Sequence, residues 1–273
     1  AALLHEIGGD WQIEEVELGD PVPGEVQVRL VSSGLCHSDH HLRTGQSPAP
    51  LPIIGGHEGA GVVVKVGPGV TRFAEGDHVV TAFIPACGTC APCSRGAQNL
   101  CDEGAGLVSG VAIADGTPRV TQNGEGVTQM CLLGTFSPYI TVNEASLIKI
   151  EDDIPLREAA LLGCGVATGW GSATAIGGTR PGDTVVIVGI GGVGINSVQG
   201  ARAAGARHIV AVDPVEFKRE TAQRYGATHT FTSMDEALPA LTEMTWGRLA
   251  DTVILTVGEI KGEHIAPALA MTA

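Results

Sequence analysis

The feature that most limits the fold of this chain is a glycine pattern that directly follows a run of β-branched residues. Thr184 to Val188 is continuously apolar or β-branched, as expected of a parallel strand buried on both faces. The next residues, Gly189 to Gly194, read G-x-G-x-x-G and open a segment of helical composition. In a chain with 39 glycines this pattern alone is weak, but the strand before it and the helix after it are the context that a dinucleotide-binding unit requires.

The residues of this pattern have distinct physical roles. The first glycine, Gly189, permits the tight turn, the second, Gly191, lets backbone approach a pyrophosphate, and the third, Gly194, lets the helix pack on the strand. The positive N-terminal end of the helix then faces the negative charge. The predicted cofactor-binding residues of this loop are Gly189, Gly191, Gly192, Val193 and Gly194.

An acidic residue follows at the spacing expected for the adenosine ribose. Asp213 closes the next predicted strand, about twenty residues after the glycines, where a carboxylate accepts hydrogen bonds from the ribose hydroxyls. A 2′-phosphate is repelled there, so the pattern favours NAD over NADP. Lys218 is close enough to reach the same ribose, although a solvated helix lysine is an equally good interpretation.

Strand and helix alternate to the end of the sequence, which predicts a doubly wound α/β domain. The predicted strands are 184–188, 208–212, 228–231 and 252–255, and the predicted helices are 192–204, 214–226, 236–245 and 263–271. The common dinucleotide-binding fold has about six strands, whereas this pattern provides four. We therefore expect the natural polypeptide to continue beyond Ala273 and this domain to be incomplete.

The first half of the chain has a different pattern of short strands and turns. Strands are predicted at 26–32, 61–66, 78–83 and 139–142, with frequent glycine and proline between them. This half is predicted to be mostly β and barrel-like. A helix is predicted to open at Asp152 and Asp153, with Pro155 in its first turn, and to run to Leu162, where Gly163 and Gly165 end it.

The amino-acid composition limits which partners and which cellular compartment we expect for this chain. The 30 acidic residues outnumber the 16 basic ones, for a net charge of −14, which argues against a nucleic acid or an anionic membrane surface as partner. No apolar run approaches the ~18 residues needed to span a bilayer, and the N-terminal residues do not form a secretory signal. Seven cysteines without an export signal favour metal binding over a disulfide framework, so we expect a reducing cytoplasm.

Four of the cysteines are crowded into fifteen residues. Cys87, Cys90, Cys93 and Cys101 can close an all-thiolate tetrahedron around zinc with no open position, which is how structural zinc is held. A disulfide pair or an iron–sulfur cluster is the alternative. Cys131 is most simply a buried thiol.

A second set of candidate ligands is scattered along the sequence. Gly56-His57-Glu58 stands at the start of a glycine-flanked predicted strand, and the isolated Cys36 and Cys164 lie far from it in sequence. If the fold brings Cys36, His57 and Cys164 together, they form an open three-ligand site of the kind that catalytic zinc uses. A histidine beside a glutamate is more often an ordinary hydrogen-bonded pair, so this convergence is the central hypothesis.

Together these motifs resemble the zinc-dependent alcohol dehydrogenases of the medium-chain dehydrogenase/reductase family. The resemblance spans essentially the whole chain and rests on the Gly56-His57-Glu58 segment, the four-cysteine lobe, the settings of Cys36 and Cys164, and the nucleotide pattern. It implies a GroES-like catalytic domain over residues 1–165, with a structural zinc lobe at about 87–101. A Rossmann NAD-binding domain over residues 166–273, incomplete at its C-terminus, follows.

The resemblance also implies roles for individual residues. Cys36, His57 and Cys164 resemble the catalytic zinc ligands, with Glu58 beside the metal and Asp39 behind His57. Ser38 resembles the hydroxyl that takes the alcohol proton, and His41 the end of that relay. The remaining implied positions are His37 near the pyrophosphate, Thr168 and Val193 beside the nicotinamide, and Phe83 in the substrate pocket, each with ordinary packing or solvation as the alternative.

The implied activity is oxidation of a primary or secondary alcohol to an aldehyde or ketone, with two zinc ions per chain and hydride transfer to NAD. Its implied partners are a small alcohol or aldehyde and further copies of the chain, as a dimer or tetramer. Within enzymes, the alternatives are a dehydrogenase of a formaldehyde–thiol adduct and a nicotinoprotein that keeps its NAD and needs an external acceptor. Outside enzymes, the alternative is a cofactor-binding relative that has lost its active metal.

Overall fold

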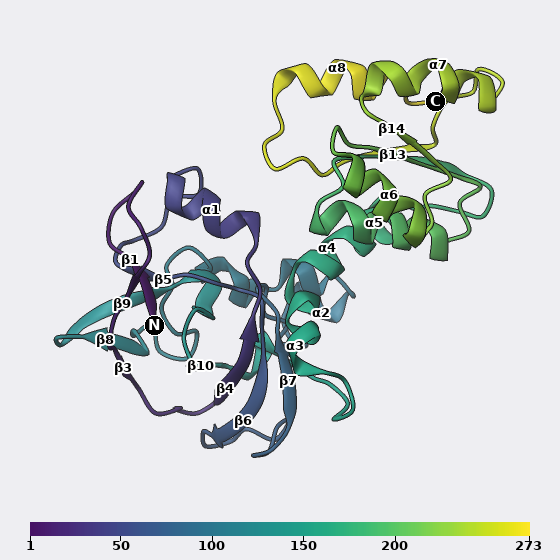
Figure 1. The fold of residues 1–273 in the computed structure, drawn as a ribbon. Coiled ribbons are helices and arrows are strands. Elements are labelled where there is room, and N and C mark those ends of the chain that lie inside the picture. Colours follow the sequence, from purple (N-terminus) through teal and green to yellow (C-terminus); the bar gives the residue numbers. More distant parts are fainter. The chain divides into compact units, whose positions relative to one another are not determined.

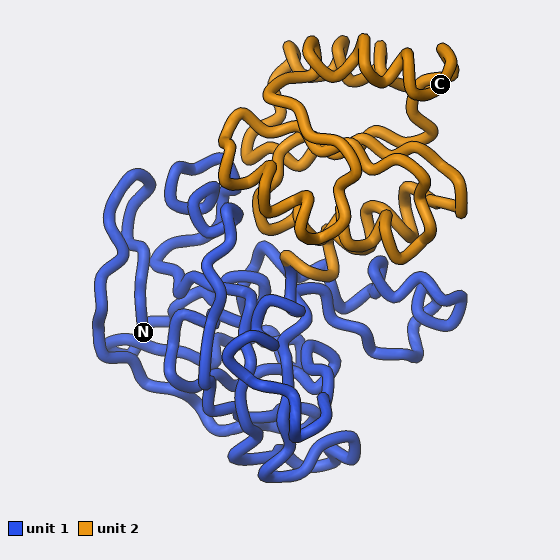
Figure 2. The backbone as a smooth tube through the Cα atoms, turned by 45° about the vertical axis from the view of Figure 1, so that its right-hand side comes forward, with its two compact units in different colours: residues 1–164 blue, residues 165–273 orange.

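The computed structural model describes residues 1–273, and the chain divides into two compact units, residues 1–164 and 165–273 (Figure 1, Figure 2). Each unit is described by itself below. No single helix is long and apolar enough to cross a membrane, and only a bent pair of short helices, 156–163 and 165–176, meets that requirement by length and composition.

Unit 1 is built mainly from two β-sheets, which confirms the mostly β prediction. The first has the order β2-β1-β5-β9-β8-β3 and the second the order β10-β4-β6-β7-β11. The strands are β1 Ala2–Leu4, β2 Gln12–Ile13, β3 Glu17–Leu18, β4 Glu25–Ser33, β5 Ile53–Ile54, β6 Gly59–Val66, β7 His78–Thr81, β8 Val120–Gln122, β9 Glu125–Gln129, β10 Tyr139–Asn143 and β11 Leu147–Lys149.

The sequence pattern explains the second sheet. In β4, Val26 and Val28 are both buried, because alternate residues of a strand point to one face. β4 pairs antiparallel with both β10 and β6, and the pairing with β6 shifts register twice. The valines pack with Val63, Val79 and Ile140 in one apolar cluster, so the predicted alternation marks the core face of this sheet.

Unit 1 contains few helical residues. They are α1 His37–Thr44, α2 Ala91–Ser94 and α3 Leu156–Ala159, with short 3-10 turns at η1 Gln98–Leu100, η2 Asp102–Gly106, η3 Met130–Leu132, η4 Glu144–Ser146 and η5 Ala160–Gly163.

The prediction that a helix opens at Asp152 and Asp153 was wrong. These residues form a turn, Pro155 is the N-cap of α3 without any side-chain cap, and η5 completes the segment. A residue that precedes proline is disfavoured in helical conformation, so Ile154 stays outside and the carboxylates lie too early in the chain to cap. Gly165 was also misassigned as part of a helix end, because it begins the next helix.

Unit 2 is a parallel four-stranded sheet covered by helices, as the alternation predicted. Its order is β14-β13-β12-β15, with β12 Thr184–Val188, β13 His208–Val212, β14 His229–Phe231 and β15 Thr252–Leu255. Its helices are α4 Gly165–Gly171, a π turn η6 Ser172–Ile176, α5 Gly192–Ala203, α6 Glu216–Tyr225, α7 Met234–Met244 and α8 Gly262–Ala270.

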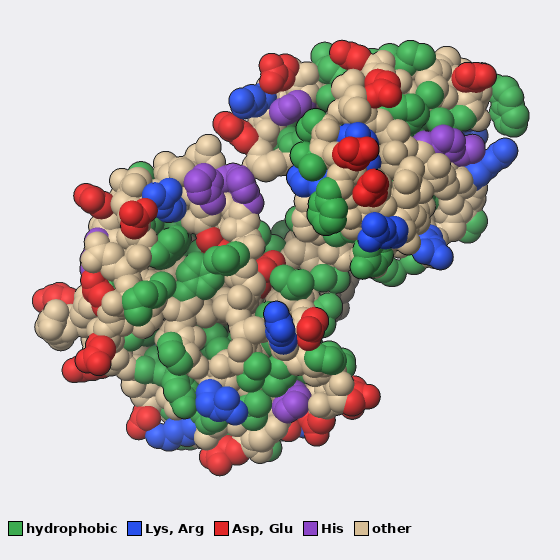
Figure 3. Space-filling model, viewed as in Figure 1, with side chains coloured by type: hydrophobic (Ala, Val, Ile, Leu, Met, Phe, Trp, Pro, Cys, Tyr) green, Lys and Arg blue, Asp and Glu red, His purple; other side chains and the backbone are tan.

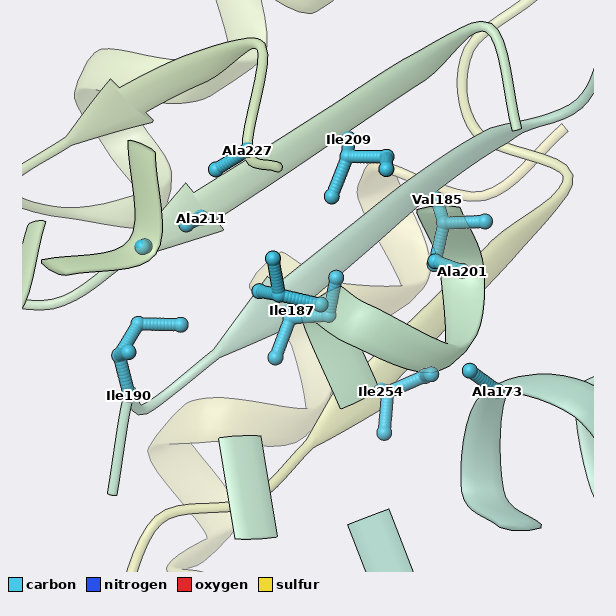
Figure 4. Packing of buried hydrophobic residues seen from close by; sticks show 11 residues of the cluster. Ala173, Val185, Ile187, Ile190, Ala201, Ile209, Ala211, Ala227 and Ile254 are labelled. Atoms are coloured by element: carbon cyan, nitrogen blue, oxygen red, sulfur yellow. The ribbon is translucent and has the colours of Figure 1, made fainter. Parts of the chain in front are cut away.

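The two faces of this sheet carry separate apolar clusters. One contains Val185, Ile187 and Ile209 with residues of α5 and α6 (Figure 4). The other contains Val186 and Val210 with residues of α7 and with Met271, the residue that follows α8. All five residues of β12 are buried, which explains why that stretch is uninterruptedly apolar or β-branched. The buried sheet thus fixes the positions of the loops that follow its strands.

Two histidines at the start of the neighbouring strands β13 and β14 make the stability of unit 2 depend on pH. His208 and His229 have ring centres 5.8 Å apart. Burial first, and then the charges of Arg207 and His229, lower the pKa of His208 below its ordinary value. Between that lowered pKa and the ordinary value of about 6.5, the unfolded chain binds a proton that the folded chain rejects, so stability is lost as the pH falls through this window.

We expect His208→Asn to reduce the loss of stability on acidification. The free energy of unfolding, measured by urea denaturation at pH 7.5 and pH 5.5, should fall less for His208→Asn than for the parent protein. Equal losses for the parent and His208→Asn would show that His208 does not contribute to the pH dependence.

Candidate active site

Four side chains that are far apart in sequence meet in unit 1. One potential ligand atom from each of Cys36, His57, Glu58 and Cys164 lies within 4.8 Å of all the others. Cys36 is the N-cap of α1, His57 and Glu58 immediately precede β6, and Cys164 follows η5. His57 and Glu58 are each 3% exposed and Cys164 is 9% exposed, so the cluster is largely withdrawn from water.

Asp39 links the parts of this cluster. One carboxylate oxygen accepts a hydrogen bond from the Cys36 backbone N–H at 2.8 Å, and the other accepts one from the Gly56 backbone N–H at 3.2 Å. The second oxygen also lies 3.3 Å from Nδ1 of His57. A carboxylate behind a histidine fixes the orientation of its ring. Asp39 therefore holds both the start of α1 and the imidazole, and leaves the opposite ring nitrogen for the thiols.

The surroundings of Cys36 in this cluster favour the thiolate form of its side chain. Hydrogen bonding, first from Cys164 and then from His57 and Ser38, outweighs burial and lowers the pKa of Cys36 to about 3. Burial by itself would lower the pKa of His57, but Asp39 and Cys36 together raise it to about 10. Without a cation, Cys36 is thus a thiolate beside a protonated His57, and a metal ion at this position would replace the imidazole proton. Two sulfurs and one imidazole at this spacing fit the ligand set of a zinc site with an open position.

Glycines allow these segments to approach each other. A Cβ at Gly34 would collide with the Glu58 carboxylate, and one at Gly163 would lie 2.9 Å from the Thr81 carbonyl oxygen. Thr81, at the end of β7, donates its hydroxyl to the His57 carbonyl at 3.1 Å and accepts the Gly59 N–H at 2.8 Å. No sequence pattern indicates the role of Thr81, which holds the backbone of His57 and Gly59 in place.

The candidate relay residues follow Cys36 in α1. The Ser38 hydroxyl is 3.6 Å from the Cys36 sulfur, so it lies beside the candidate metal position. His41 is one helical turn further on, and its ring centre is 4.7 Å from that of His37. Phe83 presents an edge-to-face contact to the His57 ring, with centres 6.0 Å apart. Ser38 and Phe83 therefore lie next to the ligand cluster, whereas His37 and His41 contact each other within α1.

Cys131 lies closer to this site than the sequence suggested. Its side chain is half-buried, and burial, with smaller effects of Asp39 and Cys36, raises its pKa to about 12. It therefore stays protonated and differs from Cys36 in its chemistry. Its backbone is in the left-handed region, with φ of 54°, which costs a non-glycine residue conformational energy.

The four-cysteine lobe forms a separate, closed cluster. The Cys87 and Cys93 sulfurs are 4.0 Å apart, and those of Cys90 and Cys101 are 3.8 Å apart. Zinc–sulfur bonds of about 2.3 Å in a tetrahedron place two sulfurs about 3.8 Å apart, whereas a disulfide requires about 2.05 Å. All seven cysteines are free. The sulfurs thus fit a single zinc ion, and the spacing excludes disulfides among them.

The glycine loop of unit 2 has the geometry of an anion-binding turn. Gly189 has a positive φ of 91°, which favours glycine. A Cβ at Gly191 or Gly192, at the start of α5, would meet nothing within 4 Å. The backbone N–H groups at the start of this helix are therefore open to a pyrophosphate. Val193 occupies the first turn of α5, and Thr168 lies in α4.

Asp213 has a structural task that the sequence did not reveal. It is 3% exposed, and its two carboxylate oxygens accept the Ile190 N–H at 2.8 Å and the Val215 N–H at 2.9 Å. Lys218 approaches the same carboxylate at 3.5 Å. Asp213 thus connects the glycine loop to the end of β13 through hydrogen bonds. Because its carboxylate oxygens already accept two backbone N–H groups, fewer of their lone pairs remain for the hydroxyls of a ribose.

Substitutions at two glycines of this loop should affect cofactor binding and folding separately. A Cβ at Gly194 would collide with the Gly189 carbonyl oxygen, whereas Gly191 has open space. We therefore expect Gly194→Ala to destabilise unit 2 by about 1–3 kcal/mol, as overpacking does. Gly191→Ala should keep the parent melting temperature and weaken NAD binding at least about tenfold by obstructing the phosphates. Thermal unfolding and NAD titration of both variants distinguish the two effects, and parent affinity in Gly191→Ala would contradict the assignment of this turn.

Comparison with known proteins agrees with this arrangement. The family model of the alcohol dehydrogenase GroES-like domain matches residues 22–152, and that of the zinc-binding dehydrogenases matches residues 192–273. Alcohol dehydrogenase B of Mycobacterium tuberculosis is 50% identical over 273 residues, which are all of this chain and 73% of that protein. The NDMA-dependent alcohol dehydrogenase of Amycolatopsis methanolica is 51% identical over 268 residues, 98% of this chain and 72% of that protein.

Solved structures agree as well. An alcohol dehydrogenase zinc-binding domain protein from Burkholderia ambifaria has a TM-score of 0.92 at 36% identity, and benzyl alcohol dehydrogenase from Acinetobacter calcoaceticus has 0.90 at 30%. Each match covers 100% of this chain and 73% of the other. The chain therefore belongs to the zinc-dependent alcohol dehydrogenases of the medium-chain dehydrogenase/reductase family. It is an NAD-dependent oxidoreductase with a GroES-like and a Rossmann-like domain.

Proposed function

We propose that this protein oxidises a small primary or secondary alcohol to an aldehyde or ketone, with NAD as the hydride acceptor. Unit 1 serves as the catalytic domain and unit 2 as the NAD-binding domain. The observation that carries this proposal is the convergence of Cys36, His57, Glu58 and Cys164 within 4.8 Å of one another.

Cys36, His57 and Cys164 are the proposed ligands of a catalytic zinc, and Cys87, Cys90, Cys93 and Cys101 those of a structural zinc, giving two ions per chain. When bound, the catalytic zinc supplies a Lewis acid that lowers the pKa of a hydroxyl, and NAD supplies the hydride acceptor. Two thiolates and a neutral imidazole balance the charge of a dication, and Glu58 adds a carboxylate at the edge of the set.

The chain's own residues then orient the substrate and move its proton. The Ser38 hydroxyl, 3.6 Å from the Cys36 sulfur, accepts the proton of the alcohol. It passes a proton on towards His41, which releases it to solvent. Phe83, edge-on to His57, forms an apolar wall that holds the carbon chain of the substrate and excludes water. Asp39 keeps the His57 ring in the ligand orientation.

In unit 2, the start of α5 binds the cofactor. Gly189, Gly191, Gly192 and Gly194 shape the loop for the pyrophosphate. The family resemblance adds His37 of unit 1 as a proposed contact of the pyrophosphate. Asp213 and Lys218 bind the ribose hydroxyls, and Thr168 and Val193 border the nicotinamide. Two observations support this part: the open space at Gly191, and the contact of Asp213 with both the loop and Lys218.

We expect His41→Gln to slow proton release without disturbing the zinc ligands. General acid–base groups typically contribute about 10²–10⁴-fold to a rate. A residue at the solvent end of a relay should lie at the lower limit of this range, so we expect a fall in kcat of about 100-fold. The pH dependence of kcat should change as well, because the proton then leaves by another path. An unchanged pH–rate profile in His41→Gln would argue against the relay.

Assays with a series of alcohols, with and without added NAD, test the proposed reaction. Turnover that requires added NAD supports the primary proposal. The second candidate is a nicotinoprotein, in which NAD stays bound and an external acceptor takes the electrons; one relative is named an NDMA-dependent alcohol dehydrogenase, so NDMA is the acceptor to test. Turnover with NDMA and no added NAD identifies that variant, and activity only on formaldehyde with a thiol identifies the thiol-adduct reaction. We also expect a homo-oligomer, which sedimentation tests.

A further inference from the structure

Three histidines lie on one side of α1, outside the buried ligand cluster. His37 is spaced i, i+3 from His40 and i, i+4 from His41, which places each of these two side chains next to His37 on the helix. The ring centres of His37 and His41 are 4.7 Å apart, and those of His37 and His40 are 5.4 Å apart. His37 and His40 are exposed and His41 is half-buried. Figure 3 shows histidine side chains gathered at α1.

These spacings are close to those that a shared metal ion imposes. With metal–nitrogen bonds of about 2.0–2.1 Å, the centres of two imidazole rings on one ion are about 4.5 Å apart at a right angle and about 5.2 Å apart at the tetrahedral angle. The two observed distances are close to these values. Because His37 and His40 are exposed, rotation of their side chains can direct one nitrogen of each ring towards a common ion at little cost.

The helix that carries these rings is fixed at both ends. Asp39 and the Cys36 backbone N–H close its first turn, and Gly45 ends it with a left-handed φ of 79°. Arg43, the arginine of the helix, is bound to the Gly9 carbonyl and to Asp10, so its charge is already compensated. The net charge of −14 raises the local concentration of cations around the protein.

We propose that His37, His40 and His41 form a third metal site, which binds a transition-metal cation such as Ni²⁺, Cu²⁺ or excess Zn²⁺. Imidazole ligands suit these ions. This site is distinct from the two cysteine-containing sets, since it contains no thiolate and lies on the exposed side of α1. Its effect on catalysis rests on the proposed function: an ion held by His41 removes that imidazole from the proton path and inhibits turnover.

Equilibrium dialysis of the zinc-loaded protein against Ni²⁺ tests this site directly. We expect one Ni²⁺ per chain, with both zinc ions retained, and a parallel loss of dehydrogenase activity. His40→Gln is the informative variant, because His40 has no place in the proposed reaction. It should keep the basal activity, bind Ni²⁺ at least tenfold more weakly and resist inhibition by Ni²⁺. His264→Gln, which removes a histidine from α8, is the matched control and should behave as the parent does.

Equal Ni²⁺ affinity in the parent and His40→Gln, or absence of Ni²⁺ binding in the parent, would overturn the site. Inhibition that is equally strong in both proteins would overturn its link to His41. A protein that binds Ni²⁺ through His40 but oxidises no alcohol would retain this site and would refute the proposed function instead, so the two failures are distinguishable.

Discussion

Cys36→Ala lowers kcat for alcohol oxidation by at least about 1,000-fold and leaves the affinity for NAD within about twofold. The substitution removes one of the three proposed zinc ligands, Cys36, His57 and Cys164. A bound metal ion that acts as a Lewis acid stabilises the transition state by several kcal/mol. Each 1.36 kcal/mol corresponds to a factor of ten in rate. Steady-state kinetics and NAD titration measure the two quantities, and NAD binding is largely preserved because all of its proposed residues except His37 lie in unit 2.

Cys131→Ala is the matched control for this variant. It removes a thiol near the same site, but a protonated one whose pKa burial raises to about 12. Its kcat should stay within a few-fold of the parent value, with at most a modest loss of stability. Full activity in Cys36→Ala, or an equal loss of activity in both variants, would contradict the assignment of Cys36 as a ligand.

Cys101→Ala has the second large effect, which is a loss of ordered structure in the four-cysteine lobe rather than a change in the reaction. Structural zinc contributes its binding free energy to folding, with apparent values of about 10–16 kcal/mol in zinc-finger peptides. The lobe contains only short turns, α2, η1 and η2, and few buried apolar side chains. We therefore expect the variant to lose one zinc ion and its amide hydrogen-exchange protection over residues 87–106.

The neighbouring Ser94 provides the control, since its hydroxyl donates to the Cys90 and Thr89 carbonyls on the exposed side of the lobe. Ser94→Ala should keep both zinc ions and the exchange protection. If Cys101→Ala retained its zinc and its protection, the four cysteines would not be acting as one closed site.

The regular elements could be predicted from the sequence because each followed one simple physical rule. The β-branched run at 184–188 and the glycines after it correspond to β12, the turn and α5. All four strands of unit 2 were predicted, with β12, β13 and β15 correct at both ends. The helix near residue 152 was predicted incorrectly because a capping pattern was given more weight than the backbone restriction imposed by Pro155.

The candidate site could be predicted only in part. The residue types and contexts of Cys36, His57 and Cys164 suggested a shared metal, but their proximity depends on the packing of three distant segments. The roles of Asp39, Asp213 and Thr81 in holding backbone depend on hydrogen bonds between loops, which no local pattern encodes. The position of Cys131 near the site likewise depends on tertiary structure. The catalytic and cofactor-binding roles of the individual residues stay predictions.

Zinc content per chain, measured side by side in the parent protein and in Cys36→Ala, tests the central claim most directly. If the three distant side chains share one ion and the four-cysteine lobe holds another, the parent contains two zinc ions per chain and Cys36→Ala contains one. One ion in the parent, or two in Cys36→Ala, would contradict the claim that Cys36, His57 and Cys164 form a metal site.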